Sequence, residues 1–179
     1  VWITGASTGI GFATAKKFLD NNWKVIISSS NENKLNEAKN RILINSSNKE
    51  LYAYKCDISN RDQVKDTVTN IFNDIGDINL AILNAAAYSP NRDQEFSIDN
   101  YEMLIDVNLK GTLYCIEFLI EKMKKLQSHI AIVTSPVGYR GLPTAGAYGL
   151  TKSGLINLGE SLYFDLKKKK IKISIINPG

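Results

Sequence analysis

Val1-Trp-Ile-Thr-Gly-Ala-Ser-Thr-Gly-Ile-Gly11 is the stretch that decides the fold. Its first four residues are apolar or β-branched, as expected of a short buried strand, and residues 12–19 carry apolar side chains at helical spacing. Gly5, Gly9 and Gly11 lie between strand and helix. Such a loop lets backbone approach an anion at the helix N-terminus. The spacing Gly-x-x-x-Gly-x-Gly differs from the usual dinucleotide fingerprint, but its context predicts a phosphate-binding loop.

The alternation of apolar strand and amphipathic helix continues along the whole chain. Strands are expected at residues 1–4, 23–28, 51–56, 79–83, 130–134 and 171–176, and helices at 12–19, 33–42, after Ser59, at 100–126 and at 147–166. Ser59 is the expected N-cap of the third helix. This order predicts an α/β fold, a doubly wound parallel sheet of Rossmann type, formed as a single domain over residues 1–179.

Bulk composition narrows the possible partners and compartment. The net charge is only +4, and much of it comes from Lys167 to Lys170 at a predicted helix end, where cations suit the helix dipole. No aromatic residues interleave with this run, so no nucleic-acid partner is predicted. Cys56 and Cys115 form no disulfide framework and indicate a reducing compartment, the cytoplasm. The apolar stretches are too short to span a membrane, and no metal site is predicted.

The stretch from Ser135 to Lys152 offers acid/base chemistry. Ser135 follows a predicted strand, and Lys152 lies four residues after Tyr148, so both side chains share one helix face. A lysine charge beside a phenol favours phenolate, and we expect it to lower the pKa of Tyr148 from about 10. Tyr148 then becomes a general acid/base. A lone Tyr-x-x-x-Lys is also common on exposed helices, and a mid-helix Asn such as Asn108 is usually a satisfied core group.

Three serines, Ser28 to Ser30, follow the second predicted strand, where dinucleotide folds read the adenosine ribose. A carboxylate there would repel a 2′-phosphate and an arginine would hold one, and neither is present. Hydroxyl groups can hydrogen-bond either ribose, so the sequence favours NADP(H) over NAD(H) only slightly.

Taken together, these motifs resemble the classical short-chain dehydrogenase/reductase family across essentially all 179 residues. The motifs fall in the family's order and spacing: Thr4 to Gly11, Asp57, Asn84-Ala85, Asn108, Ser135, Tyr148-x-x-x-Lys152 and Pro178-Gly179. The resemblance implies an NAD(P)-dependent oxidoreductase that transfers a hydride between a nicotinamide cofactor and a carbonyl or alcohol.

The resemblance also implies individual roles. Tyr148 would be the acid/base, Lys152 would lower its pKa and hold the nicotinamide ribose, Ser135 would bind the substrate oxygen, and Asn108 would help hold a water that supplies protons to Lys152. The implied cofactor-binding residues are Gly5, Ser7, Thr8, Gly9, Ile10, Gly11, Ser29, Ser30, Asp57, Ile58, Asn84, Ala85, Ala86, Tyr148, Lys152, Pro178 and Gly179. Relatives assemble through their two long helices, so a homodimer or homotetramer is expected.

Some positions depart from the family pattern. Ala86 replaces a usual glycine and adds a methyl beside the expected cofactor path, and Thr8 stands where many NADP-dependent members have a basic residue. Relatives continue past Pro-Gly with a substrate loop and a seventh strand, so we expect a fragment that also lacks the start of the first strand. Two rivals remain: a catalytically idle dinucleotide-binding or sensor protein, and an epimerase-like extended relative, whose usual glycine spacing differs.

Overall fold

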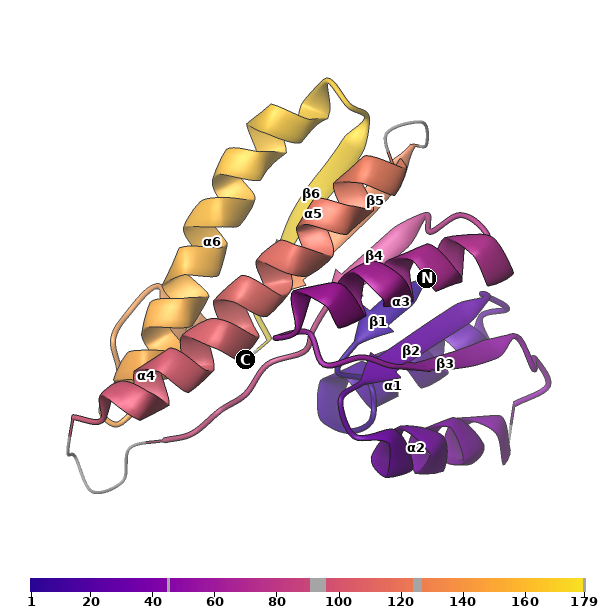
Figure 1. Ribbon diagram of the computed structural model, residues 1–179, viewed down its shortest axis with the longest axis horizontal. Coiled ribbons are helices and arrows are strands. Elements are labelled where there is room, and N and C mark those ends of the chain that lie inside the picture. The colour runs from indigo at the N-terminus through magenta and orange to yellow at the C-terminus, as the bar shows by residue number, and fades with distance from the viewer. Residues whose placement is uncertain (45, 91–95, 124–126, 179) are drawn as a thin grey trace.

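The computed structural model describes residues 1–44, 46–90, 96–123 and 127–178. Gly179, which was predicted to bind the cofactor, therefore lies outside the described residues. Its strands form one parallel sheet in the order β3-β2-β1-β4-β5-β6 (Figure 1). Their bounds are β1 Trp2–Thr4, β2 Val25–Ser29, β3 Leu51–Lys55, β4 Leu80–Leu83, β5 Ser128–Val133 and β6 Ile171–Ile176. This is the strand order of doubly wound dinucleotide folds, so the predicted fold class is confirmed.

The helices cover both faces of the sheet. Their bounds are α1 Gly9–Asp20, α2 Glu32–Ile44, α3 Arg61–Asp74, α4 Ile98–Leu104, α5 Gly111–Met123 and α6 Gly146–Lys167. Two shorter helical segments complete the chain: the π-helical η1 Ile105–Lys110 lies between α4 and α5, and the 3-10 turn η2 Pro136–Gly138 lies between β5 and α6. Helices α1 and α2 lie on one face, and α3, α5 and α6 lie on the other (Figure 1). Within the described ranges, no helix is long and apolar enough to cross a bilayer.

The sheet separates two apolar clusters. The first contains Trp2, which is fully buried, and side chains of α3, α5 and α6. The second contains Ile3, its strand neighbour, with Leu19 of α1 and Leu35 of α2. Successive strand residues point to opposite faces, so Trp2 and Ile3 anchor β1 in both layers. A buried central strand holds the loop that follows it in a fixed position.

One local prediction is wrong, and one is confirmed only in part. The N-cap of α3 is Asn60, whose side chain accepts from the backbone of Gln63, and not Ser59. Ser59 instead donates its hydroxyl to Asp57 at 2.7 Å. The long helix predicted over residues 100–126 runs without a break over residues 98–123, with η1 as a π-helical turn between α4 and α5, and residues 124–126 lie outside the described ranges. A π-helical turn inserts a residue into the helical ladder without disturbing the apolar pattern enough to be seen in the sequence.

Candidate active site

A cavity of about 640 Å³ opens at the carboxyl ends of β1, β2, β3 and β4. The strand order reverses between β1 and β4, the point at which such sheets bind ligands. Most of the predicted cofactor-binding residues line it: Gly5, Ser7, Thr8, Gly9, Ile10, Ser29, Ser30, Asp57, Ile58, Asn84, Ala85 and Ala86. Cys56, Ser59, Ala87 and Val107 also line it and were not predicted. We call this cavity the cofactor cleft.

The glycine loop is shaped by steric requirements at two positions. Gly5 has φ +65°, and a Cβ built there would lie 2.6 Å from the Cα of Ala85. Gly11 is buried and does not line the cleft, and a Cβ there would lie 2.6 Å from both the Gly5 carbonyl oxygen and the Asn84 amide nitrogen. Both glycines therefore allow the loop to pack against the segment that follows β4.

Hydrogen bonds from side chains to backbone join the ends of β1 and β4. The Thr4 hydroxyl accepts from the backbone N–H groups of Asn84 and Ala85, each at 3.0 Å. The Asn84 amide donates to the carbonyls of Thr4 at 3.0 Å and Gly5 at 3.1 Å. Asn84 thus positions the glycine loop, a structural contact that its predicted cofactor role did not anticipate.

The three serines after β2 do not share one environment. Ser28 is buried, and its hydroxyl accepts from the Trp2 indole at 3.1 Å. The Ser29 hydroxyl lies 3.1 Å from that of Ser7, and Ser30 is exposed at the rim of the cleft. Across the cleft, the Asp57 carboxylate accepts from both the backbone and the hydroxyl of Ser59. Hydroxyls and one carboxylate therefore form the polar wall of the cleft.

Ser135, Tyr148 and Lys152 meet beside the end of β5. Ser135 follows β5 and N-caps η2, accepting from the backbone of Val137. Tyr148 lies in the first turn of α6, and its ring centroid is 5.4 Å from the Lys152 ammonium. Lys152 is only 2% exposed, and its ammonium donates to the Val133 carbonyl at 2.9 Å. Burial lowers the pKa of Lys152 to about 8.

The expected depression of the Tyr148 pKa does not occur in this structure. Burial raises the pKa of Tyr148 above its ordinary value, a hydrogen bond with Ser135 opposes that rise, and Tyr88 adds to it. Lys152 does not lower the tyrosine pKa, because its ammonium lies over the ring and donates to Val133. Ser135 is thus the group that favours the phenolate here.

Asn108 lies in η1, fully buried, with its side chain hydrogen-bonded on both sides. Its amide oxygen accepts from the Ala87 backbone at 2.7 Å, and its amide nitrogen donates to the Ala87 carbonyl at 3.0 Å. The same nitrogen donates to the Thr151 hydroxyl at 3.1 Å, and Thr151 donates to the Tyr148 carbonyl at 2.7 Å. Asn108 therefore links the loop after β4 to the helix that carries Tyr148. Ala87 and Thr151 carry no motif that would have revealed this link.

A smaller cavity of about 290 Å³ adjoins the tyrosine. It is lined by Tyr88, Ser135, Val137, Leu142, Ala145 and Tyr148. The rings of Tyr88 and Tyr148 meet edge to face with centroids 5.0 Å apart. Because Ser135 and Tyr148 both line this space among apolar side chains, a polar atom entering it would meet both hydroxyls. We call it the substrate cavity, after the substrate contact predicted for Ser135 and Tyr148.

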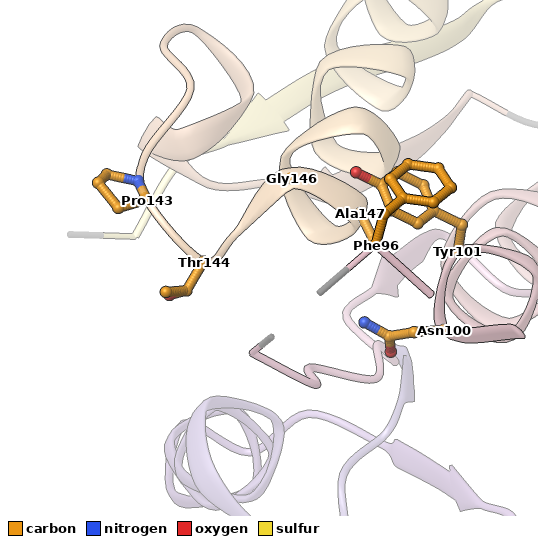
Figure 2. A pocket seen from close by; sticks show the side chains of 7 residues that line it. All are labelled: Phe96, Asn100, Tyr101, Pro143, Thr144, Gly146 and Ala147. Carbon is orange, nitrogen blue, oxygen red and sulfur yellow. The ribbon is translucent and has the colours of Figure 1, made fainter. Parts of the chain in front are cut away.

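A further hollow of about 360 Å³ lies between α4 and the loop that precedes α6. Figure 2 shows Pro143 and Thr144 on one side and Asn100, Tyr101 and Phe96 on the other, with the rings of Phe96 and Tyr101 close together beside Ala147. Those rings stack with centroids 4.8 Å apart. Thr144 adopts φ +64° in this loop. The hollow contains none of the predicted site residues.

The described C-terminal residues lie beside β5. Asn177 accepts from the Thr134 hydroxyl, and its amide donates to the Tyr139 hydroxyl at 3.0 Å. Pro178 is partly buried and does not line the cofactor cleft. The structure therefore does not bring Pro178 to the other predicted cofactor-binding residues.

Comparison with known proteins identifies the family. The family model for short chain dehydrogenases matches residues 1–179. An uncharacterised oxidoreductase of Staphylococcus epidermidis is 27% identical over 178 residues, which are 99% of this chain and 75% of that protein. One of Staphylococcus aureus is 26% identical with the same coverage.

Solved structures agree in fold. Serine dehydrogenase from Escherichia coli superposes with a TM-score of 0.90 at 24% identity, over 99% of this chain and 81% of that one. At that identity the likeness shows the fold alone. An NAD+-bound xylitol dehydrogenase superposes with a TM-score of 0.90 at 27% identity, over 99% of this chain and 68% of that one. Because the family model matches this chain over residues 1–179, the chain belongs to the short chain dehydrogenase family, whose members are oxidoreductases.

Proposed function

We propose that this protein is an NAD(P)-dependent oxidoreductase that interconverts a carbonyl and an alcohol, with Tyr148 as the acid/base. The observation that carries the proposal is that Ser135 and Tyr148 line one small cavity while Lys152 is buried against the tyrosine ring. Burial shifts the pKa values of both Tyr148 and Lys152, and ionisable groups with shifted pKa values beside a cavity are typical of catalytic sites. A catalytically idle binding protein has no need of this set.

The cofactor cleft fits a dinucleotide. The loop from Gly5 to Gly11 precedes the N-terminus of α1, where free backbone N–H groups favour a pyrophosphate. Ser7, Ser29 and Asp57 offer polar groups for the adenosine side. When bound, a nicotinamide cofactor supplies or accepts the hydride. Ala86 is exposed at the cleft, so its methyl has open space around it.

The cofactor preference follows from the charges around Ser29 and Ser30. Asp57 is the one carboxylate among the residues that line the cleft, and it already accepts two hydrogen bonds from Ser59. The lining contains no lysine or arginine. We therefore propose only a modest preference for NADP(H) over NAD(H), to be measured by titrating both reduced cofactors and following nicotinamide fluorescence.

Each residue of the candidate active site has its own role in the proposed proton transfer. In carbonyl reduction, the Tyr148 hydroxyl donates its proton to the carbonyl oxygen, and in alcohol oxidation the phenolate takes a proton back. Ser135 donates a hydrogen bond to the same oxygen and stabilises the negative charge that develops there. Lys152, whose ammonium lies over the Tyr148 ring, would hold the nicotinamide ribose. Asn108 acts as a positioning residue through Ala87 and Thr151, and its implied part in a water relay stays a prediction.

We propose the oligomeric state from exposed apolar side chains and the cellular compartment from the two cysteines. Leu113 of α5 and Phe164 of α6 are exposed apolar side chains, as expected of a homodimer or homotetramer formed through these helices. Cys56 and Cys115 are both buried and unpaired, which suits the reducing cytoplasm. We further propose that residues 1–179 form one dinucleotide-binding domain.

The test compares turnover with cofactor binding in matched variants. A panel of ketones, aldehydes and alcohols is screened by nicotinamide absorbance at saturating cofactor. Tyr148→Phe is expected to lower kcat by at least about a hundredfold, with an unchanged cofactor Kd. Tyr163→Phe is the control, because Tyr163 lies on the same helix and is exposed. Equal turnover in Tyr148→Phe and the wild type would exclude the acid/base role, and cofactor binding with no turnover on any compound would favour the binding-protein alternative.

A further inference from the structure

A second polar cavity, of about 610 Å³, lies at the opposite end of the sheet. Its polar lining comes from Gln127 before β5, from Ser128 and His129 at the start of β5, from Lys167 at the end of α6, from Lys170 in the turn after it, and from Lys172 on β6. The cofactor cleft opens at the carboxyl ends of the strands and this cavity at the amino ends. Six residues of strand separate the two ends, about 20 Å. We call this space the basic cavity.

The charge in the basic cavity is uncompensated. Three lysines and a histidine line it, and no carboxylate does. In the part of the chain that the structure describes, no carboxylate lies within ion-pairing distance of Lys167, Lys170 or Lys172. The nearby end of α6 contributes carbonyl groups, but the backbone N–H groups of Lys169 and Lys170 already donate to two of them. The cavity therefore has a net positive potential.

Ser128 supplies an observation independent of charge. It is only 3% exposed, and its hydroxyl has no hydrogen-bond partner among the described residues. A buried hydroxyl without a partner is uncommon in native proteins, because the lost hydrogen bonds to water are not replaced. A ligand oxygen at the base of the cavity would accept from this hydroxyl.

Lys170 adds a third observation, a strained backbone. It has φ +58°, the left-handed conformation in which the residue after a helix is usually glycine or asparagine. A side chain with a Cβ is strained there, and such strain is found at functional sites more often than elsewhere. The chain keeps a lysine at this position, and that lysine lines the cavity.

His129 follows Ser128 on β5 and lines the cavity from the opposite face of the sheet, because successive strand residues point to opposite faces. Its Nε2 lies 2.9 Å from the Ser174 hydroxyl, and its strand neighbours are Leu80 on β4 and Lys172 on β6. Burial lowers the pKa of His129, and the charge of Lys172 lowers it further. An anion in the cavity would reverse the effect of Lys172.

We propose that the basic cavity is a second ligand site that binds the phosphate group of a soluble small-molecule anion. Lysine ammonium groups and a serine hydroxyl are donors that suit phosphate oxygens. Tyr163 and Ile173 form an apolar wall beside them, which suits the organic part of a phosphate ester. The site does not depend on the proposed oxidoreductase chemistry, because it shares no residue with the cofactor cleft or the substrate cavity.

His129 makes the test local, because it is the only histidine in the sequence. The imidazole proton resonances are followed by NMR as inorganic pyrophosphate is added to the 179-residue chain. The proposal predicts a saturable shift and a higher His129 pKa in the bound form. Pyrophosphate that binds only at the glycine loop would leave the resonances of His129 unchanged, and that result would overturn the proposal.

Lys170→Gly is the decisive variant because it removes a cation and relieves backbone strain together. We expect roughly fivefold weaker pyrophosphate binding at His129, with a melting temperature equal to or above that of the wild type. Asn22→Gly is the backbone control, since Asn22 also has a positive φ and does not line the cavity, and Lys34→Gln is the charge control. If Lys34→Gln weakened pyrophosphate binding as much as Lys170→Gly, the effect would come from net charge alone, and that result would contradict the proposed site.

A membrane lipid headgroup carries the same phosphate chemistry, so vesicles form the second arm. Co-sedimentation is measured with vesicles of phosphatidylcholine alone and with vesicles that also contain phosphatidylglycerol, because basic segments bind anionic lipid surfaces. The proposal expects the pyrophosphate effect at His129 whether or not vesicles are present. Binding to anionic vesicles with no response to pyrophosphate would identify a lipid surface and overturn the soluble ligand.

Discussion

The cofactor cleft and the proposed acid/base group, Tyr148 and Lys152, both lie at the carboxyl end of the sheet, but they are built differently. The cleft is made from backbone, glycines and small side chains, and Thr4 and Asn84 hold its two walls together through hydrogen bonds to main-chain atoms. The acid/base group consists of two ionisable side chains whose pKa values are set mainly by burial. Substitutions in the cleft should therefore alter its shape, whereas substitutions at Tyr148 and Lys152 should alter the charge at the proposed acid/base group.

The largest expected effect of this difference is at Ser135. Ser135→Ala removes the hydroxyl that contacts Tyr148 and lines the substrate cavity. We expect kcat to fall by about 10²–10³, the effect of losing one donor to a developing oxyanion, while the cofactor Kd stays the same. Steady-state kinetics and a fluorescence titration measure the two quantities. A weaker cofactor Kd with an unchanged kcat would mean that Ser135 belongs to the cleft.

Lys152 should make stability depend on pH. Burial lowers its folded-state pKa to about 8 from an ordinary value of 10.5. Between these values the unfolded chain binds more protons than the folded chain, so the free energy of unfolding rises with pH. The full gain is about 3 kcal/mol, from 1.36 kcal/mol per pKa unit.

Lys152→Met has no such titration and serves as the reference. Urea unfolding of both proteins is measured from pH 7 to pH 10.5. The wild-type free energy of unfolding minus that of the variant should increase across this range. A difference that stays constant with pH would show that the Lys152 pKa is not depressed.

Two glycines of the cleft should respond unequally to alanine. At Gly11 the new Cβ would lie 2.6 Å from the Gly5 carbonyl oxygen, whereas at Gly9 no atom lies within 4 Å and only the φ of +57° is unfavourable. We expect Gly11→Ala to cost about 1–3 kcal/mol of stability and Gly9→Ala about 1 kcal/mol. Thermal unfolding of both variants measures the two losses of stability. A larger loss at Gly9 would contradict the steric account of the loop.

The smallest expected effect is at Thr4. Thr4→Val keeps the shape of the side chain but removes the acceptor for the N–H groups of Asn84 and Ala85. We expect a stability loss of about 1–2 kcal/mol and a weaker cofactor Kd, with kcat at saturating cofactor unchanged. A change in kcat alone would show that the cleft and the acid/base group are not separable in this way.

Sequence reasoning predicted what depends on local pattern. The glycine loop identified the strand–loop–helix unit, and the four-residue spacing of Tyr148 and Lys152 placed both on one face of α6. The N-cap of α3 was misplaced by one residue, because Ser59 and Asn60 are both good caps and only the structure shows Ser59 bound to Asp57.

The remaining errors concern contacts between distant segments. The pKa of Tyr148 depends on its burial and on Ser135, and the position of the Lys152 ammonium depends on the Val133 carbonyl. Spacing along a helix cannot reveal either effect. The link from Asn108 to Ala87 also joins residues 21 positions apart through a π-helical turn that the apolar pattern does not show.

The most direct test of the central claim follows the hydride itself. Reduced cofactor deuterated at C4 of the nicotinamide is mixed with a carbonyl substrate found in the screen, and the alcohol product is examined by mass spectrometry in a single turnover. The wild type is predicted to place deuterium on the former carbonyl carbon, and Tyr148→Phe, saturated with the same cofactor, is predicted to slow that transfer by at least about a hundredfold. Deuterium transfer at the wild-type rate in Tyr148→Phe would contradict the assignment of Tyr148 as the acid/base.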